Sequence, residues 1–96
     1  MEDKLTLNDT IEWMTSDNFK DRLVAEYVQL KIRINKLQNY LYDIGDDAYI
    51  IKDEIFIRQL GSMLEYEDAL LHRINNAGID LNIYTYAINP EKWGVI

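Results

Sequence analysis

The residues best suited to binding chemistry are cations and tyrosines in and around residues 19–41. This segment carries five basic and two acidic residues, although the whole chain has a formal charge of −7. Arginine and lysine pair with phosphate oxygens, and tyrosine rings offer faces on which a nucleobase can stack. The same cations can also form an ordinary solvated face that pairs with acidic neighbours. The candidate ligand-binding residues are Arg22, Lys31, Arg33, Lys36, Tyr40 and Tyr66.

Side chains suited to catalysis are scarce. A catalytic site needs a nucleophile, a poised acid or base, and groups that stabilise charge. Cysteine is absent, His72 is the single histidine, and the four glycines form no phosphate-binding loop. Ser16 is better explained as a helix cap, and Ser62 lacks the glycines of a nucleophile elbow. We therefore expect no enzyme activity, no cofactor and no metal site.

Acidic residues gather in two places, at 43–54 and at 65–68. The first group has carboxylates at positions one, five and twelve of a calcium-loop pattern, but Ala48 stands where that loop needs a glycine. We therefore expect a solvated acidic connection there. The second group, together with Asp53 and Glu54, could imitate the phosphates of a nucleic acid and occupy a basic surface of another protein.

The spacing of apolar residues predicts the elements that position these groups. Residues 8–14 suit a short helix, and the cap-forming run 15–18 precedes a helix expected at about 17–42. Apolar residues repeat along this helix at alternating spacings of four and three, the seam of a helix packed against another helix. That seam consists of Leu23, Tyr27, Leu30, Ile34, Leu37 and Leu41.

A second helix follows the acidic connection and ends at the Asn75-Asn76-Ala77-Gly78 run. Its apolar stripe is broad and is interrupted by Glu67. Beyond it, residues 79–88 alternate in a pattern typical of a strand, and Asn89-Pro90 ends that pattern. The stripe consists of Phe56, Ile57, Leu60, Met63, Leu64, Leu70, Leu71 and Ile74.

These patterns predict one all-α domain over residues 1–96. It consists of a helical hairpin at about 17–77, a short N-terminal helix and an extended, strand-like C-terminal arm at 78–96. A chain of 96 residues has a small core, so we expect a homo-oligomer formed through the hairpin or the arm. No apolar run is long enough to span a bilayer, and the N-terminus lacks the pattern of a secretory signal. We therefore expect a cytoplasmic protein that binds neither membrane nor nucleic acid directly.

Polar residues recur with the apolar ones in both predicted helices. The first helix carries Arg22-Leu23, Glu26, Leu30, Arg33-Ile34, Lys36-Leu37 and Leu41, and the second carries Arg58-Gln59-Leu60, Met63, Tyr66, Leu70 and Arg73-Ile74. Over roughly residues 19–75 this pattern resembles a family of small, mostly uncharacterised proteins of phages and prophages, including crAss-like phages. Gly61, inside the second helix, departs from the family pattern.

The layout of a leading segment and a helical hairpin is also similar to phage sponge proteins, which sequester cyclic-nucleotide signals of bacterial immunity such as those of CBASS and Thoeris. The resemblance implies a phage-encoded, non-enzymatic protein that acts in the host cytoplasm by binding such a signal. No binding residue is carried over from the sponge proteins, so the candidate residues rest on their own chemistry. The alternative is an acidic or coiled-coil-like inhibitor or adaptor that binds a host protein.

Overall fold

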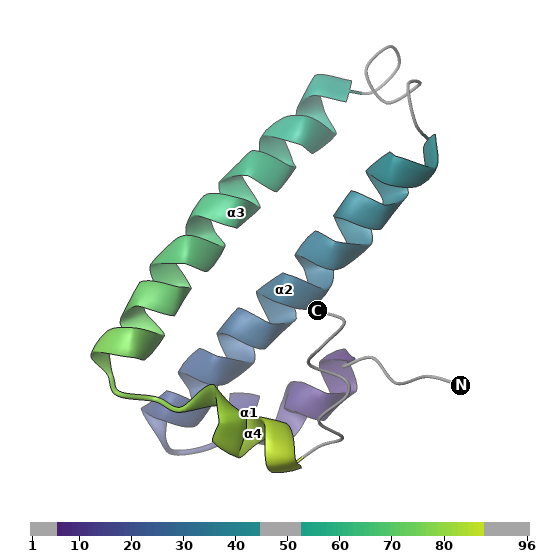
Figure 1. Cartoon of the computed structure of the whole chain (residues 1–96). Helices are drawn as coiled ribbons and strands as arrows, with labels where there is room; N and C mark the ends of the chain where they lie inside the picture. The colour runs from purple at the N-terminus through teal and green to yellow at the C-terminus, as the bar shows by residue number, and fades with distance from the viewer. Residues whose placement is uncertain (1–5, 45–52, 88–96) are drawn as a thin grey trace.

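The chain forms a helical hairpin with short helical segments packed at its open end (Figure 1). This computed structural model describes residues 6–44 and 53–87. The predicted all-α class, the hairpin and the short N-terminal helix are confirmed. None of the described helices is both long and apolar enough to cross a membrane. The elements are the 3-10 helix η1 (Leu7–Thr10), α1 (Ile11–Met14), the hairpin helices α2 (Phe19–Ile44) and α3 (Asp53–Asn76), and α4 (Leu81–Ala87).

The polar run before α2 fixes where this helix begins. The side-chain Oδ1 of Asn18 accepts a hydrogen bond from the backbone N–H of Lys20 at 2.9 Å, which is the geometry of an N-cap. Ser16 Oγ accepts from the N–H of Asn18 and donates to the carboxylate of Asp21 at 2.8 Å. The cap-forming residues therefore lie just outside the helix, and α2 begins at Phe19.

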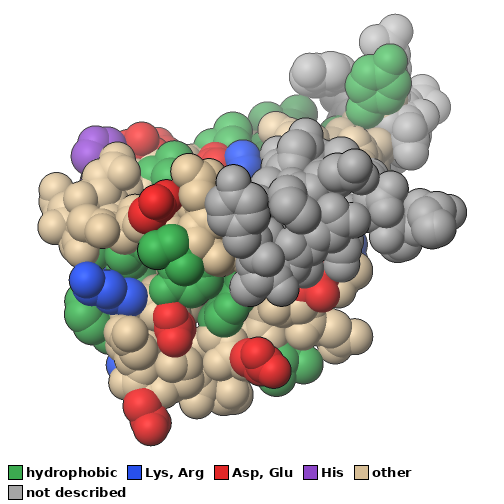
Figure 2. Space-filling model, turned by 60° about the horizontal axis from the view of Figure 1, so that its bottom comes forward, with side chains coloured by type: hydrophobic (Ala, Val, Ile, Leu, Met, Phe, Trp, Pro, Cys, Tyr) green, Lys and Arg blue, Asp and Glu red, His purple; other side chains and the backbone are tan. Residues whose placement is uncertain are grey.

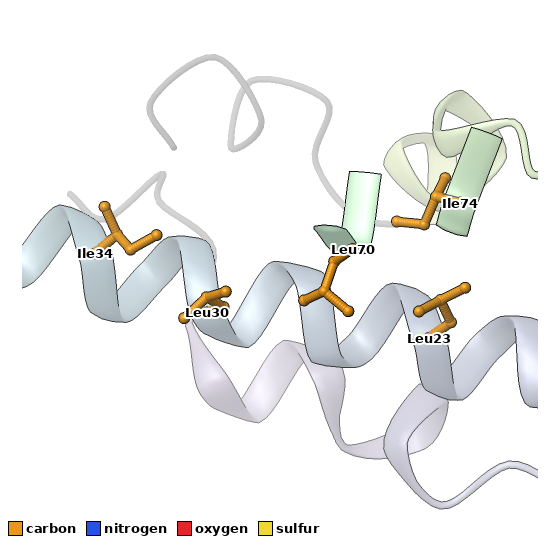
Figure 3. Close-up of a cluster of buried hydrophobic side chains, with 5 residues drawn as sticks. All are labelled: Leu23, Leu30, Ile34, Leu70 and Ile74. Atoms are coloured by element: carbon orange, nitrogen blue, oxygen red, sulfur yellow. The ribbon is translucent and has the colours of Figure 1, made fainter. Parts of the chain in front are cut away.

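The hairpin is held together by one face of each long helix. Leu23, Leu30 and Ile34 from α2 are buried against Leu70 and Ile74 from α3 (Figure 3). Their spacing in the sequence, four, seven or eleven residues, places each set on one side of its helix. The partly buried residues that pack against this cluster are Tyr27, Leu60, Met63, Ile79 and Leu81.

A second buried face of α2 holds the short helices. Val24 and Val28 are fully buried and form a cluster with Ile32. Trp13 of the N-terminal segment and Tyr84 of α4 pack against this cluster, so it faces the short helices. Helix α2 thus supports the hairpin core on one side and the short helices on another.

The side chain of Gln29 contacts the N-terminal segment. Its Nε2 donates to the Oγ1 of Thr10 at 2.9 Å and lies 3.3 Å from the sulfur of Met14. Thr10 is buried, and its hydroxyl donates to the carbonyl of Leu7 at 2.7 Å. Gln29 therefore supplies a donor to a buried hydroxyl and fastens the N-terminal segment to α2.

The expected extended arm is wrong for residues 81–87, which form α4. Helix α3 ends in a Schellman motif, in which Gly78 has a φ of 69° and the N–H of Ile79 bonds to the carbonyl of Ile74 at 3.2 Å. Asp80 then caps α4, because its Oδ1 accepts from the N–H of Asn82 at 3.0 Å. The alternating pattern favoured a strand, but no strand lies among the described residues to pair with it, and a helical turn brings Leu81 to the core. Residues 88–96, which complete the expected arm, lie outside the described part.

Helix α4 is tied to the beginning of α2 by Tyr84. Its hydroxyl donates to Asp21 Oδ1 at 2.6 Å, and its ring meets Trp13 edge to face with centroids 5.2 Å apart. The hydrogen bonds from Tyr84 and Ser16 lower the pKa of Asp21 because they stabilise its charged form. Burial and the bond to Asp21 raise the pKa of Tyr84 to about 12.

Candidate functional site

Two contacts fix how the helices of the hairpin are aligned. Lys31 Nζ lies 2.6 Å from Glu67 Oε2, and nearer the loop the ring of Tyr40 meets the ring of Phe56 with centroids 5.6 Å apart. Both pairs join α2 to an antiparallel α3 (Figure 1). In this alignment Arg33 and Tyr66 lie at the same height along the hairpin.

Four of the six candidate residues fall on one side of the hairpin. Arg33, Lys36 and Tyr40 are exposed and are three, four or seven residues apart, which places them on one side of α2. Tyr66 is 45% exposed and directly precedes Glu67, so it is turned about 100° around α3 away from the Lys31 side. We call this surface the cation–aromatic face and define it by Arg33, Lys36, Tyr40 and Tyr66.

Lys31 lies on the other side of the hairpin and is committed to an interhelical ion pair. Its side chain is 26% exposed and that of Glu67 is 14% exposed, so both charges are largely withdrawn from solvent. Burial raises the pKa of the neighbouring Tyr27, an effect that Lys31 partly offsets and Glu67 reinforces. Lys31 therefore aligns the helices rather than joining the cation–aromatic face.

Arg22 is on the same side of α2 as Arg33 but three turns nearer the N-terminus, about 16 Å away along the helix. Its guanidinium Nη1 donates to the carbonyl of Ser16 at 2.7 Å. This bond stabilises the turn before α2. The structure thus brings four of the six candidates together and separates Arg22 and Lys31 from them.

The sequence reasoning missed Arg73 as a member of this side. Arg73 is exposed and follows Tyr66 by seven residues, so both lie on the same side of α3. The seven-residue spacing was visible in the sequence, but only the alignment with α2 places it beside the face formed by Arg33. Glu26 lies level with Arg73 on α2 and is the acidic member of this side.

Four other titratable side chains of α3 lie on its solvent side. Glu54, Glu65, Asp68 and His72 are exposed, and the Nδ1 of His72 lies 2.9 Å from the carbonyl and 3.5 Å from the carboxylate of Asp68. Within residues 6–44 and 53–87, no three His, Cys, Asp or Glu side chains gather as metal ligands. The view from the end that carries α1 and α4 shows acidic side chains predominating over basic ones (Figure 2).

The fold makes this chain a small helical-hairpin protein with cations and tyrosines along one side of the hairpin. A family model described as Sequestin matches residues 17–76, more than half of the chain and all of α2 and α3, so the chain belongs to the Sequestin family. The match covers the stretch on which the resemblance to phage hairpin proteins is based, and the family name is compatible with a sequestering role. No curated protein and no solved structure matches the chain.

Proposed function

We propose that this protein is a phage-encoded, non-enzymatic binding protein that sequesters a phosphate-bearing nucleotide signal of host immunity, such as a cyclic nucleotide, in the host cytoplasm. Arg33 and Lys36 would pair with phosphate oxygens, and Tyr40 and Tyr66 would offer surfaces for a base. A sponge of this kind works by mass action, so it needs affinity and abundance rather than turnover.

The observation that carries this proposal is the cation–aromatic face within the segment matched by the Sequestin family. Arg33 and Lys36 are one turn apart and exposed, so neither is withdrawn from solvent as Lys31 is. Tyr66 faces the same side from the opposite helix, and Arg73 extends the positive charge two turns further along α3. A planar base with an attached phosphate matches this combination of charge and ring.

The proposal is tested by incubating the full chain with a panel of cyclic dinucleotides, cyclic trinucleotides and cyclic ADP-ribose variants. Melting temperature and native mass are followed together, because a ligand that binds the folded state raises the melting temperature and adds its own mass. We expect one class of nucleotide to do both. A panel that leaves both quantities unchanged at millimolar ligand would contradict the proposal.

A second function is favoured by the exposed acids on the solvent side of α3. Glu54, Glu65 and Asp68 extend over about 21 Å of helix and could occupy a basic surface of a host protein. In that case the inhibitory activity resides in these carboxylates, and removing the charge of Arg33 leaves it unchanged.

A further inference from the structure

Helix α3 carries a row of apolar side chains that the hairpin core does not cover. Ile57 and Leu64 are each 40% exposed, and they lie seven residues apart with the half-buried Leu71 a further seven along. This is the spacing with which one helix packs along another. Leu64 is three residues before Glu67, so the row lies on the Lys31 side of the hairpin.

Gly61 lies on the same side of α3, between Ile57 and Leu64. A glycine destabilises the interior of a helix relative to alanine, so its presence calls for a reason. Gly61 has no positive φ, and a Cβ built at this position meets nothing within 4 Å. Neither the backbone nor any neighbour in the described part of the chain requires a glycine here. Gly61 therefore leaves a shallow gap in the exposed row, one turn from Leu64.

We propose that α3 pairs antiparallel with α3 of a second copy of this chain, around a two-fold axis between Gly61 and Leu64. In this arrangement Leu64 of each copy covers Gly61 of the other. Ile57 of each copy lies within one helical turn of Leu71 of the other along the helix axis. The contact is self-complementary because the gap and the side chain that fills it lie on the same helix.

Charge favours the antiparallel direction and selects a second copy as the occupant. Asp68, four residues after Leu64 and three before Leu71, lies within the exposed row, whereas Arg58 and Glu65 border the row on its solvent side. The two-fold axis places Arg58 almost level with Asp68 and near Glu65 of the second copy, so the carboxylate within the row gains a cation. Symmetry forms this contact twice. A parallel in-register pairing would instead set Asp68 against Asp68 within the row, which is repulsive, and would turn the flank that carries Arg58 away from Glu65 of the second copy.

The proposed pairing leaves the cation–aromatic face free. Leu64 and Tyr66 are two residues apart and point to nearly opposite sides of α3. The pairing therefore rests on different residues from the proposed nucleotide binding, and either can fail without the other.

Sedimentation velocity of the full chain, from about 1 to 200 μM, tests the pairing, because a contact at the small end of protein interfaces gives a weak dimer. We expect the mass to approach twice the 11.4 kDa of one chain as concentration rises. Leu64→Glu places a carboxylate in the row and should weaken the dimer at least about tenfold. Ile55→Glu is the matched control and should leave the dimer intact. Ile55 is 63% exposed and lies on the other flank of the same helix.

Two further variants test the geometry itself. Gly61→Leu fills the gap and should abolish the dimer while the circular dichroism of the helices is kept or strengthened. Arg58→Glu should weaken the dimer, and adding Glu65→Arg to it should restore the association. A chain that stays monomeric at 200 μM, or an assembly that Gly61→Leu and Leu64→Glu leave intact, would overturn the proposal.

Discussion

At the scale of single residues, the hydrogen bond from Tyr84 to Asp21 joins groups 63 positions apart in the sequence and fastens α4 to α2. Tyr84→Phe removes the bond but keeps the ring against Trp13. We expect it to lower the free energy of unfolding by about 1 kcal/mol at pH 7, as measured by urea denaturation.

The difference in unfolding free energy between wild type and Tyr84→Phe should change with pH in a definite direction. The pKa of Asp21 is lowered in the folded state, so the stabilisation is present at neutral pH and is lost as the pH falls below about 3.8. The pKa of Tyr84 is raised from 10.0 to about 12, so the stabilisation is also lost as the pH rises through that interval. A difference between wild type and Tyr84→Phe that stays constant from pH 3 to pH 7 would contradict this account.

The ion pair between Lys31 and Glu67 is expected to matter most when one partner is removed. Lys31→Met leaves a largely buried carboxylate without its cation and should cost about 1–3 kcal/mol of unfolding free energy. The double variant Lys31→Met with Glu67→Leu should return to within about 1 kcal/mol of wild type, because neither charge then needs solvation. Chemical denaturation of the three proteins measures both effects, and equal losses in the single and double variants would show that the pair itself is strongly stabilising.

At the scale of elements, the two glycines of the described helices and turns provide an internal comparison. Gly78 and Gly61 both have open space where the methyl group of an alanine would lie, but only Gly78 has a positive φ. Gly78→Ala should therefore destabilise the fold by about 1 kcal/mol, because an L-residue is strained at the end of α3. Gly61→Ala should stabilise it by roughly 0.5–1 kcal/mol, because alanine is the better helix former. Thermal or urea unfolding at low micromolar protein tests both, and shifts of the same sign would refute the distinction.

The hairpin helices could be predicted from the sequence because their apolar residues keep the helical spacing over many turns. Leu23, Leu30 and Ile34 lie on the predicted seam and are buried. The C-terminal segment could not be predicted in the same way, since its alternating residues suit a strand over a short stretch. Its helical form depends on contacts made across the chain by Leu81 and Tyr84, which local spacing does not reveal.

At the scale of the whole molecule, the candidate site was predicted only in part. Residue type identified the cations, and helical spacing grouped Arg33 with Lys36. The sequence could not show that Lys31 would pair with Glu67, or that Tyr66 would lie level with Arg33, because both depend on the alignment of α2 with α3. Arg73 was missed for the same reason.

Salt and charge reversal distinguish the two proposed functions. Nucleotide affinity that depends on Arg33 and Lys36 should fall as ionic strength rises, and reversing Glu54, Glu65 and Asp68 to Lys should preserve or strengthen it. Glu67 is left unchanged because it pairs with Lys31. An inhibitor that uses the acidic side of α3 should lose its effect on infected cells after the same reversal. That loss, with the helical circular dichroism retained, would favour the host-protein inhibitor.

The most direct test of the central claim is the affinity of the nucleotide identified in the panel for Arg33→Ala and Lys36→Ala, measured by isothermal titration calorimetry. Each exposed side chain should leave stability within about 0.5 kcal/mol of wild type and weaken binding by about 1–3 kcal/mol, through the loss of charge-assisted hydrogen bonds to phosphate. Lys20→Ala, an exposed cation of α2 outside the cation–aromatic face, should bind as wild type does. Unchanged affinity in both Arg33→Ala and Lys36→Ala would contradict the account.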